Sequence, residues 1–177
     1  NCAIAVAAAV GAVELSITIG ATAVTKNQYA GGYLHVNDND AEGECYRIKS
    51  HPAHAGTGTL VVTLYDELEK ALTTSAEVTL TANPYNGVII VPNAALSAPA
   101  VGVPMIDVTI SYYFWLQVKG PAAVLGQGTL VIGQKVGLGG TADGACGPVA
   151  ADVTDIWGRV MQVNASTEYS LIDLMLE

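Results

Sequence analysis

The sequence predicts an all-β protein, made of small β-sandwich or β-barrel regions with very little helix. Apolar and polar residues alternate with a period of two along several stretches, which is typical of strands that bury one face. Val, Ile, Thr and Tyr, which favour strands, fill these stretches. Segments rich in Gly, Asn and Asp interrupt them at short intervals, as expected for turns between strands.

The alternation is clearest in the N-terminal half. Residues 13–19, VELSITI, place Val, Leu and Ile side chains on one face and Glu, Ser and Thr on the other. Residues 59–65 and 77–81 repeat this pattern. The evidence for helix is weak and is confined to residues 65–72, YDELEKAL, which could form one or two turns with Asp66 as the N-cap. Further strands are predicted over residues 33–37, 44–50, 87–91, 107–118, 129–133, 156–163 and 168–176.

A proline-rich stretch predicts a division of the chain. Residues 91–104, VPNAALSAPAVGVP, hold three of the seven prolines and no charged residue. Because proline cannot donate a hydrogen bond to a β-ladder, we expect an extended connector here. The predicted organisation is an N-terminal β region over residues 1–91, a connector over residues 92–104 and a C-terminal β-barrel region over residues 105–177.

The composition favours protein partners over nucleic acid or membrane. The chain has 7 Lys and Arg against 16 Asp and Glu, a formal charge of −9, and only 13% charged residues. Binding to phosphates needs clustered cations, so no direct nucleic-acid partner is expected. No apolar stretch reaches the roughly 20 residues that a membrane-spanning helix needs. With so few charges, part of the surface is expected to be neutral or covered by other subunits.

No catalytic signature is present, and the chain is not expected to be an enzyme or to bind a cofactor. It lacks the GxSxG, HExxH, P-loop and dinucleotide-binding motifs. The three cysteines Cys2, Cys45 and Cys146 form no CxxC pair, so we predict small buried thiols in a reducing compartment.

Two segments have the residue types of a metal site, but no metal is predicted. His51 and His54 have a spacing that suits one face of a helix, yet Pro52 and the neighbouring strands oppose a helix there. Residues 37–44, NDNDAEGE, supply oxygen atoms of the kind that calcium prefers. An Asn/Asp/Gly cluster between two strands is more typical of a hairpin turn, so calcium is kept only as the alternative for this segment.

The segment SYYFWLQVKG, residues 111–120, places four consecutive aromatic residues in a chain that has eleven (8 Tyr, 2 Trp and 1 Phe). In a strand, Tyr113 and Trp115 would share one face with Ser, Gln and Lys, which suits a contact surface. The alternative is that this face packs on the neighbouring region. The opposite face would be apolar and is predicted to be core; it comprises Ile110, Tyr112, Phe114, Leu116 and Val118.

Segments along nearly the whole chain resemble a family of tailed-phage structural proteins. The opening, AAAVGAVELSITIGATAVTKNQYAGGYLHVND, is followed in the family's order by GECYRIKSHPA, LYDELEKALTTSAEVTLTANPYNGVIIVP and GVPMIDVTISYYFWLQVKGPAAVLGQGTLVIGQKVG. The ending, WGRVMQVNASTEYSLIDLMLE, is similar too. The C-terminal part resembles phage capsid decoration (cement) proteins in GPAAVLGQGTLVIGQKVG, a Gly/Ala-rich loop, and GRVMQV with EYSLIDLML.

The resemblance implies a virion protein that is made in the host cytoplasm and binds the outer capsid surface. Its implied partners are the major capsid protein and copies of itself, as a trimer, and its implied role is to stabilise the shell. It carries over no catalytic residue. Two alternatives stay open: a tail or fibre-type adhesin that binds host glycan, and a secreted carbohydrate-binding β module.

Overall fold

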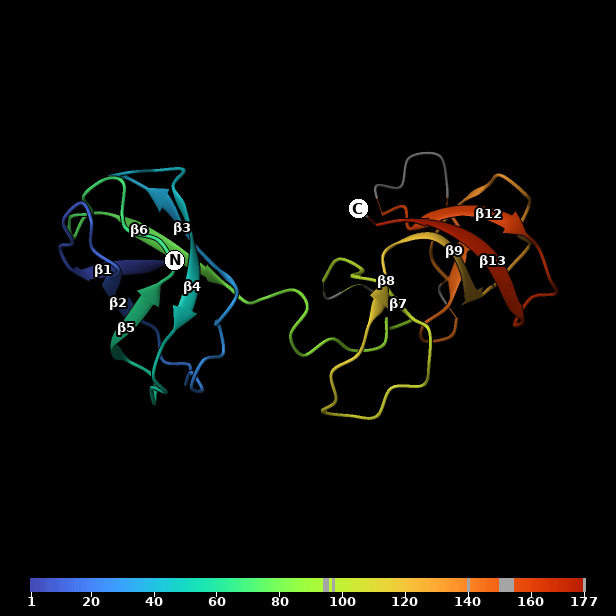
Figure 1. Cartoon of the computed structure of the whole chain (residues 1–177), viewed down its shortest axis with the longest axis horizontal. Helices are drawn as coiled ribbons and strands as arrows, with labels where there is room; N and C mark the ends of the chain where they lie inside the picture. The colour runs from blue at the N-terminus through green and yellow to red at the C-terminus, as the bar shows by residue number, and fades with distance from the viewer. Residues whose placement is uncertain (94–95, 97, 140, 150–154, 177) are drawn as a thin grey trace. The chain divides into compact units, whose positions relative to one another are not determined.

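The computed structural model describes residues 1–93, 96, 98–139, 141–149 and 155–176. Its described residues contain strands, turns and no helix, which confirms the predicted all-β class. The chain forms two compact units, Asn1–Asn86 and Gly87–Glu177 (Figure 1).

The first unit is a closed antiparallel barrel of six strands, in the order β1-β2-β5-β4-β3-β6. Closure pairs β1 with β6, so every strand has two neighbours and no edge is left open. The interior is filled by the alternate apolar side chains that the sequence places on one face of each strand, among them Leu15, Ile17, Leu60 and Val62. The strands are β1 (Cys2–Val6), β2 (Glu14–Ile19), β3 (Tyr33–Asp38), β4 (Cys45–Ser50), β5 (Gly58–Leu64) and β6 (Glu77–Thr81).

The short helix considered for residues 65–72 is not formed. Leu68 and Leu72 are each 1% exposed and belong to the barrel core. Their backbone N–H groups donate to the carbonyls of Ala12 and Ala8, each at 2.9 Å. These long-range bonds take the donors that a helix would need, and burial of two leucines outweighs a weak local helix preference.

The second unit contains a five-stranded antiparallel sheet in the order β11-β10-β12-β13-β9, and a two-stranded sheet, β7-β8. Its separate core contains Val124, Val136, Trp157 and Ile172. The two edge strands approach each other through an isolated parallel bridge between Gly126 and Cys146. The strands are β7 (Val103–Pro104), β8 (Leu116–Gln117), β9 (Lys119–Leu125), β10 (Lys135–Leu138), β11 (Cys146–Pro148), β12 (Gly158–Gln162) and β13 (Tyr169–Met175).

The proline-rich stretch lies inside the second unit. Residues 94, 95 and 97 of the expected connector fall outside the described residues, but Leu96, Ala100 and Val103 pack against the core of the second unit. The N–H of Gly144 donates to the carbonyl of Val91 at 2.8 Å. The structural boundary therefore follows Asn86, ahead of the prolines.

Three of the predicted strands are wrong. Residues 87–91 and 129–133 form no strand, and of residues 107–118 only Leu116–Gln117 are paired. A strand needs a partner as well as β-favouring side chains, and residues 107–115 have none. Residues 129–133 form a turn region instead, in which the N–H of Gly133 donates to the carbonyl of Val160 at 2.8 Å.

Candidate protein interface

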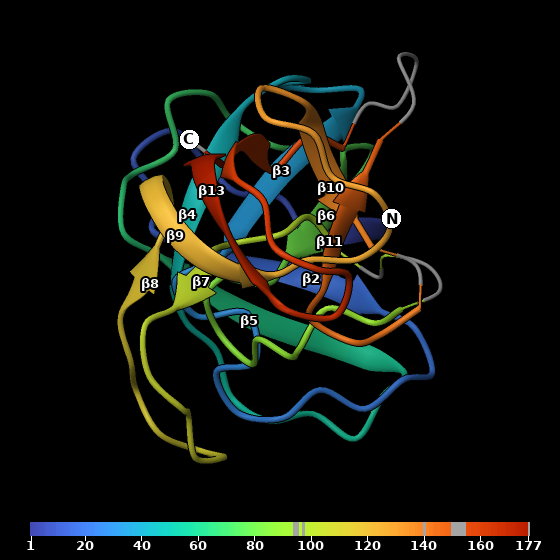
Figure 2. The ribbon, with the colours of Figure 1, turned by 90° about the vertical axis from the view of Figure 1, so that its right-hand side faces the viewer.

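The most exposed apolar segment of the described chain is the loop between β7 and β8, residues 105–115, which we call the arm. Figures 1 and 2 show this loop reaching away from the five-stranded sheet of its unit. Its base is closed by two strand pairs, Val103 with Gln117 and Pro104 with Leu116. Gly102 permits this closure, because its φ is +152° and a Cβ there would lie 2.7 Å from Cβ of Leu116.

The arm presents apolar side chains to solvent. Trp115 is 93% exposed and Tyr113 is 105% exposed, so both are open to solvent almost over their whole surface. Asp107 is the arm's only charged residue. Large exposed apolar surfaces are typical of interaction sites, so the arm is the candidate interface. The other exposed apolar residues of the arm are Met105, Ile106, Val108, Ile110 and Tyr112.

The prediction that half of the aromatic cluster is core is wrong. Tyr112 is 72% exposed and Ile110 is 88% exposed, while Phe114, Leu116 and Val118 are half-buried. The cause is the missing strand: residues 109–112 turn, with the N–H of Tyr112 donating to the carbonyl of Thr109 at 3.3 Å, so the chain does not alternate between two faces. Tyr113 and Trp115 are accessible, and their contact role stays a prediction.

Sequence reasoning missed most of the arm. It selected Tyr113 and Trp115 from an assumed strand, but not Met105 or Ile106, which are more than half exposed. The available signal was a long apolar segment with one charge and no partner strand of matching length.

The acidic segment at residues 37–44 comprises the last two residues of β3 and the turn that leads to β4, consistent with the predicted hairpin. Its side chains reach the segment at residues 70–75. Glu44 Oε1 lies 2.6 Å from Lys70 Nζ, and this hydrogen bond raises the pKa of Lys70. Asp40 accepts hydrogen bonds from the backbone and hydroxyl of Thr73, and Asn39 donates to the carbonyl of Ser75 at 2.9 Å.

The two histidines considered as ligands have separate structural roles. His51 is 3% exposed, and its Nε2 accepts a hydrogen bond from the N–H of Tyr29 at 2.9 Å. The proton is therefore on Nδ1, which donates to the carbonyl of Pro52 at 2.9 Å. His54 Nδ1 accepts from the N–H of Gly56 at 3.2 Å. Within the described part of the chain, no group of three or more His, Cys, Asp or Glu could hold a metal ion.

The cysteine prediction holds for one residue of three. Cys146 is buried, whereas Cys45 is exposed and Cys2 is half-buried. Cys45 was expected to be buried because free cysteine usually is. It instead occupies an outward-facing position at the start of β4, a strand in which exposed and buried residues alternate. Burial raises the pKa of the Cys146 thiol to about 11.

Comparisons with protein-family models, curated proteins and solved structures find no match for this chain. The described residues include no helix of the length and apolarity required to cross a membrane.

Proposed function

We propose that this chain is a virion structural protein that binds the outer surface of a capsid shell and stabilises it, in the manner of a decoration protein. The observation that carries the proposal is the arm, with its two almost fully exposed aromatic side chains and single charge. The resemblance of the sequence to phage decoration proteins supports the shell as the proposed partner.

The arm suits a protein partner because of its chemistry. Burying a large apolar side chain contributes on the order of 2 kcal/mol, and exposed Trp and Tyr are the residue types that most often dominate protein interfaces. A surface with one carboxylate, that of Asp107, can be covered without leaving many charges unpaired.

The proposed role needs no catalytic step, cofactor or metal. The partners are the major capsid protein and further copies of the chain, as a trimer. A shell presents the same binding surface many times, so linked copies of a modest contact would hold more tightly than one alone. The net charge of −9 opposes contact with the packaged nucleic acid.

The test is retention of recombinant protein on virus particles prepared without this chain. Trp115→Ala is expected to reduce the retained copies at least about tenfold, while the melting temperature changes little, because Trp115 contributes almost no buried surface to its own unit.

Tyr169→Ala is the matched control, since Tyr169 is an exposed aromatic residue of the same unit outside the arm. Equal retention of the Trp115 variant and the wild type would remove the arm from the interface. Failure of the wild-type chain to bind the shell would overturn the proposed function itself.

A further inference from the structure

We propose that the outer face of the six-stranded barrel binds an acidic saccharide through Tyr33, Arg47 and Tyr65. This inference concerns the first unit alone and does not depend on the proposed binding of the arm to a shell.

The three residues form a row across neighbouring strands. Tyr33 of β3 is paired in register with Arg47 of β4. The next pair along β4 and β5 joins Ile48 to Leu64, so Arg47 lies opposite Tyr65, whose N–H donates to the carbonyl of Arg47 at 3.0 Å. Because neighbouring strands lie about 4.8 Å apart, the two tyrosines flank Arg47 at opposite ends of a row of roughly 10 Å.

The row faces solvent. Successive side chains of a strand point to opposite sides, and the sequence neighbours Leu34, Ile48 and Leu64 are all buried in the barrel core. Tyr33 is 45% exposed and Tyr65 is 56% exposed, so each side chain is partly covered by the protein and partly open to solvent.

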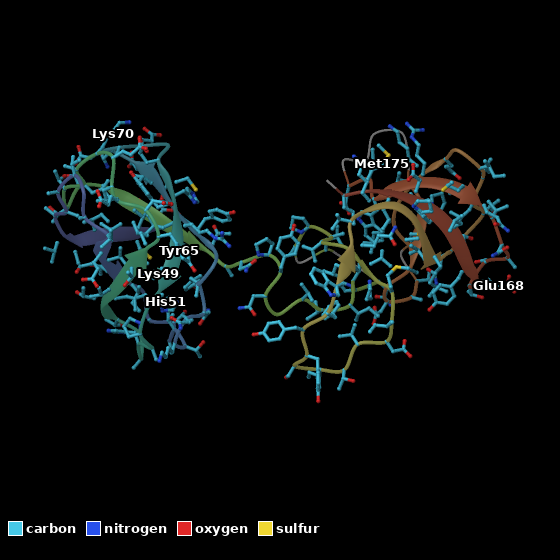
Figure 3. All side chains as sticks on the ribbon, viewed as in Figure 1. Lys49, His51, Tyr65, Lys70, Glu168 and Met175 are labelled. Carbon is cyan, nitrogen blue, oxygen red and sulfur yellow. The ribbon has the colours of Figure 1, made fainter. Side chains whose placement is uncertain are left out.

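Arg47 is available to an external anion. Its guanidinium carbon lies 5.6 Å from the centre of the Tyr65 ring, a cation–π contact that holds the side chain over the row. The single ion pair among the described residues is that of Lys70 with Glu44, so Arg47 forms no ion pair with a described carboxylate. Lys49, the next outward residue of β4, is exposed as well and adds a second positive charge (Figure 3).

The chemistry of the row fits a carboxylate-bearing sugar. A guanidinium binds a carboxylate through two parallel hydrogen bonds. A tyrosine ring on each side offers an apolar surface to the C–H face of a sugar ring and a hydroxyl for its polar edge. The row would therefore hold a short oligosaccharide with its carboxylate at Arg47.

Other classes of partner fit less well. Two exposed cations in a chain of charge −9 are too few for a nucleic-acid backbone. A protein partner needs an apolar centre to its interface, but the remaining outward residues of β3 and β4 beside the row are polar or small, such as His35, Cys45 and Lys49.

The test is a titration of the ¹⁵N-labelled full chain with α-linked trigalacturonate, followed by its amide chemical shifts. We expect saturable shifts centred on residues 33, 47 and 65, with a dissociation constant of about 1 mM or below. The methyl ester of the same trisaccharide, which lacks the carboxylate charge, is expected to bind at least about tenfold more weakly.

Arg47→Ala is expected to weaken binding of trigalacturonate about tenfold or more. Arg47→Lys is expected to weaken it less, because lysine keeps the charge but cannot form the two parallel hydrogen bonds of a guanidinium. Arg159→Ala, in the second unit, is the matched control and should bind as the wild type does. Tyr65→Phe keeps the aromatic ring and removes only the hydroxyl. The amide spectrum of each variant shows directly whether that variant is folded.

Three results would overturn the inference. One is the absence of shifts at this row with about 10 mM trigalacturonate. Another is equal binding of the acid and its methyl ester. The last is that inorganic phosphate at the same concentration shifts the same amide signals as far as trigalacturonate does, which would show a general anion effect at Arg47 and Lys49.

Discussion

His51 fastens the segment before β3 to the barrel through three polar atoms, Nε2 and its backbone nitrogen and oxygen, while Nδ1 bonds to the adjacent Pro52. Besides its two ring contacts, its backbone N–H donates to Asn27 Oδ1 at 3.0 Å and its carbonyl accepts from the N–H of Asn27 at 3.1 Å. His51→Phe keeps an aromatic ring of similar size but leaves the N–H of Tyr29 without its partner. We expect the free energy of unfolding of the first unit to fall by about 1–3 kcal/mol in urea denaturation. His35→Phe, on the outer face, should change it much less; equal losses would contradict this role for the buried ring.

Cys146 gives the second unit a pH dependence at the alkaline end. The folded thiol has a pKa of about 11, above the ordinary value of 9.0, because burial disfavours the thiolate. The neutral thiol therefore contributes its full stability below about pH 9, and that contribution is lost as the pH rises toward about 11. We expect the wild type to lose about 2 kcal/mol of stability relative to Cys146→Ala across this window. Urea unfolding at several pH values measures the difference, and parallel curves for the two proteins would refute it.

The strands that the sequence predicts well are those that bury one face. β2 to β6, together with β12 and β13, lie within a residue or two of the predicted ranges, because alternation reports a half-buried strand directly. β1, β9, β10 and β11 are rich in Ala, Gly or Pro and carry little of this pattern. The arm shows the opposite error: its side chains favour a strand, yet no partner strand pairs with it.

The two candidate sites differ in how far the sequence reveals them. Tyr113 and Trp115 belong to a visible aromatic run, although the strand register used to select them is absent. The row of Tyr33, Arg47 and Tyr65 depends on which strands become neighbours in the barrel, and pairing between distant strands is not encoded in local periodicity.

At the element scale, Gln117 protects the free edge of β9. Its side-chain amide donates to the carbonyls of Lys119 at 3.1 Å and Pro121 at 2.8 Å, and Pro121 has no N–H to offer. An unprotected edge strand can pair with another chain. Gln117→Val is therefore expected to increase self-association, measured by light scattering against concentration. Gln162→Val, at an exposed position of β12, is the control. Unchanged scattering of the Gln117 variant would mean that Pro121 alone blocks the edge.

At the scale of the molecule, each unit has its own hydrophobic core, and the residues of the two cores do not overlap. A closed barrel of this size can bury enough apolar surface to fold alone. We expect the fragment of residues 1–86 to show a cooperative thermal transition by circular dichroism. The same is expected of the fragment of residues 87–177, whose core includes Val91, Leu96 and Val103.

A fragment that starts at residue 105 should be less stable by several kcal/mol, because it lacks these side chains. Equal stability of the two C-terminal fragments would contradict this assignment of the proline-rich stretch.

The most direct measurement of the proposed function is electron cryo-microscopy of particles from the virus that encodes this chain. The proposal predicts density for the chain in many symmetric copies on the outer surface of the shell, with Tyr113 and Trp115 buried against a neighbouring subunit. Density confined to the tail, or particles that lack the chain, would contradict the assignment as a capsid decoration protein.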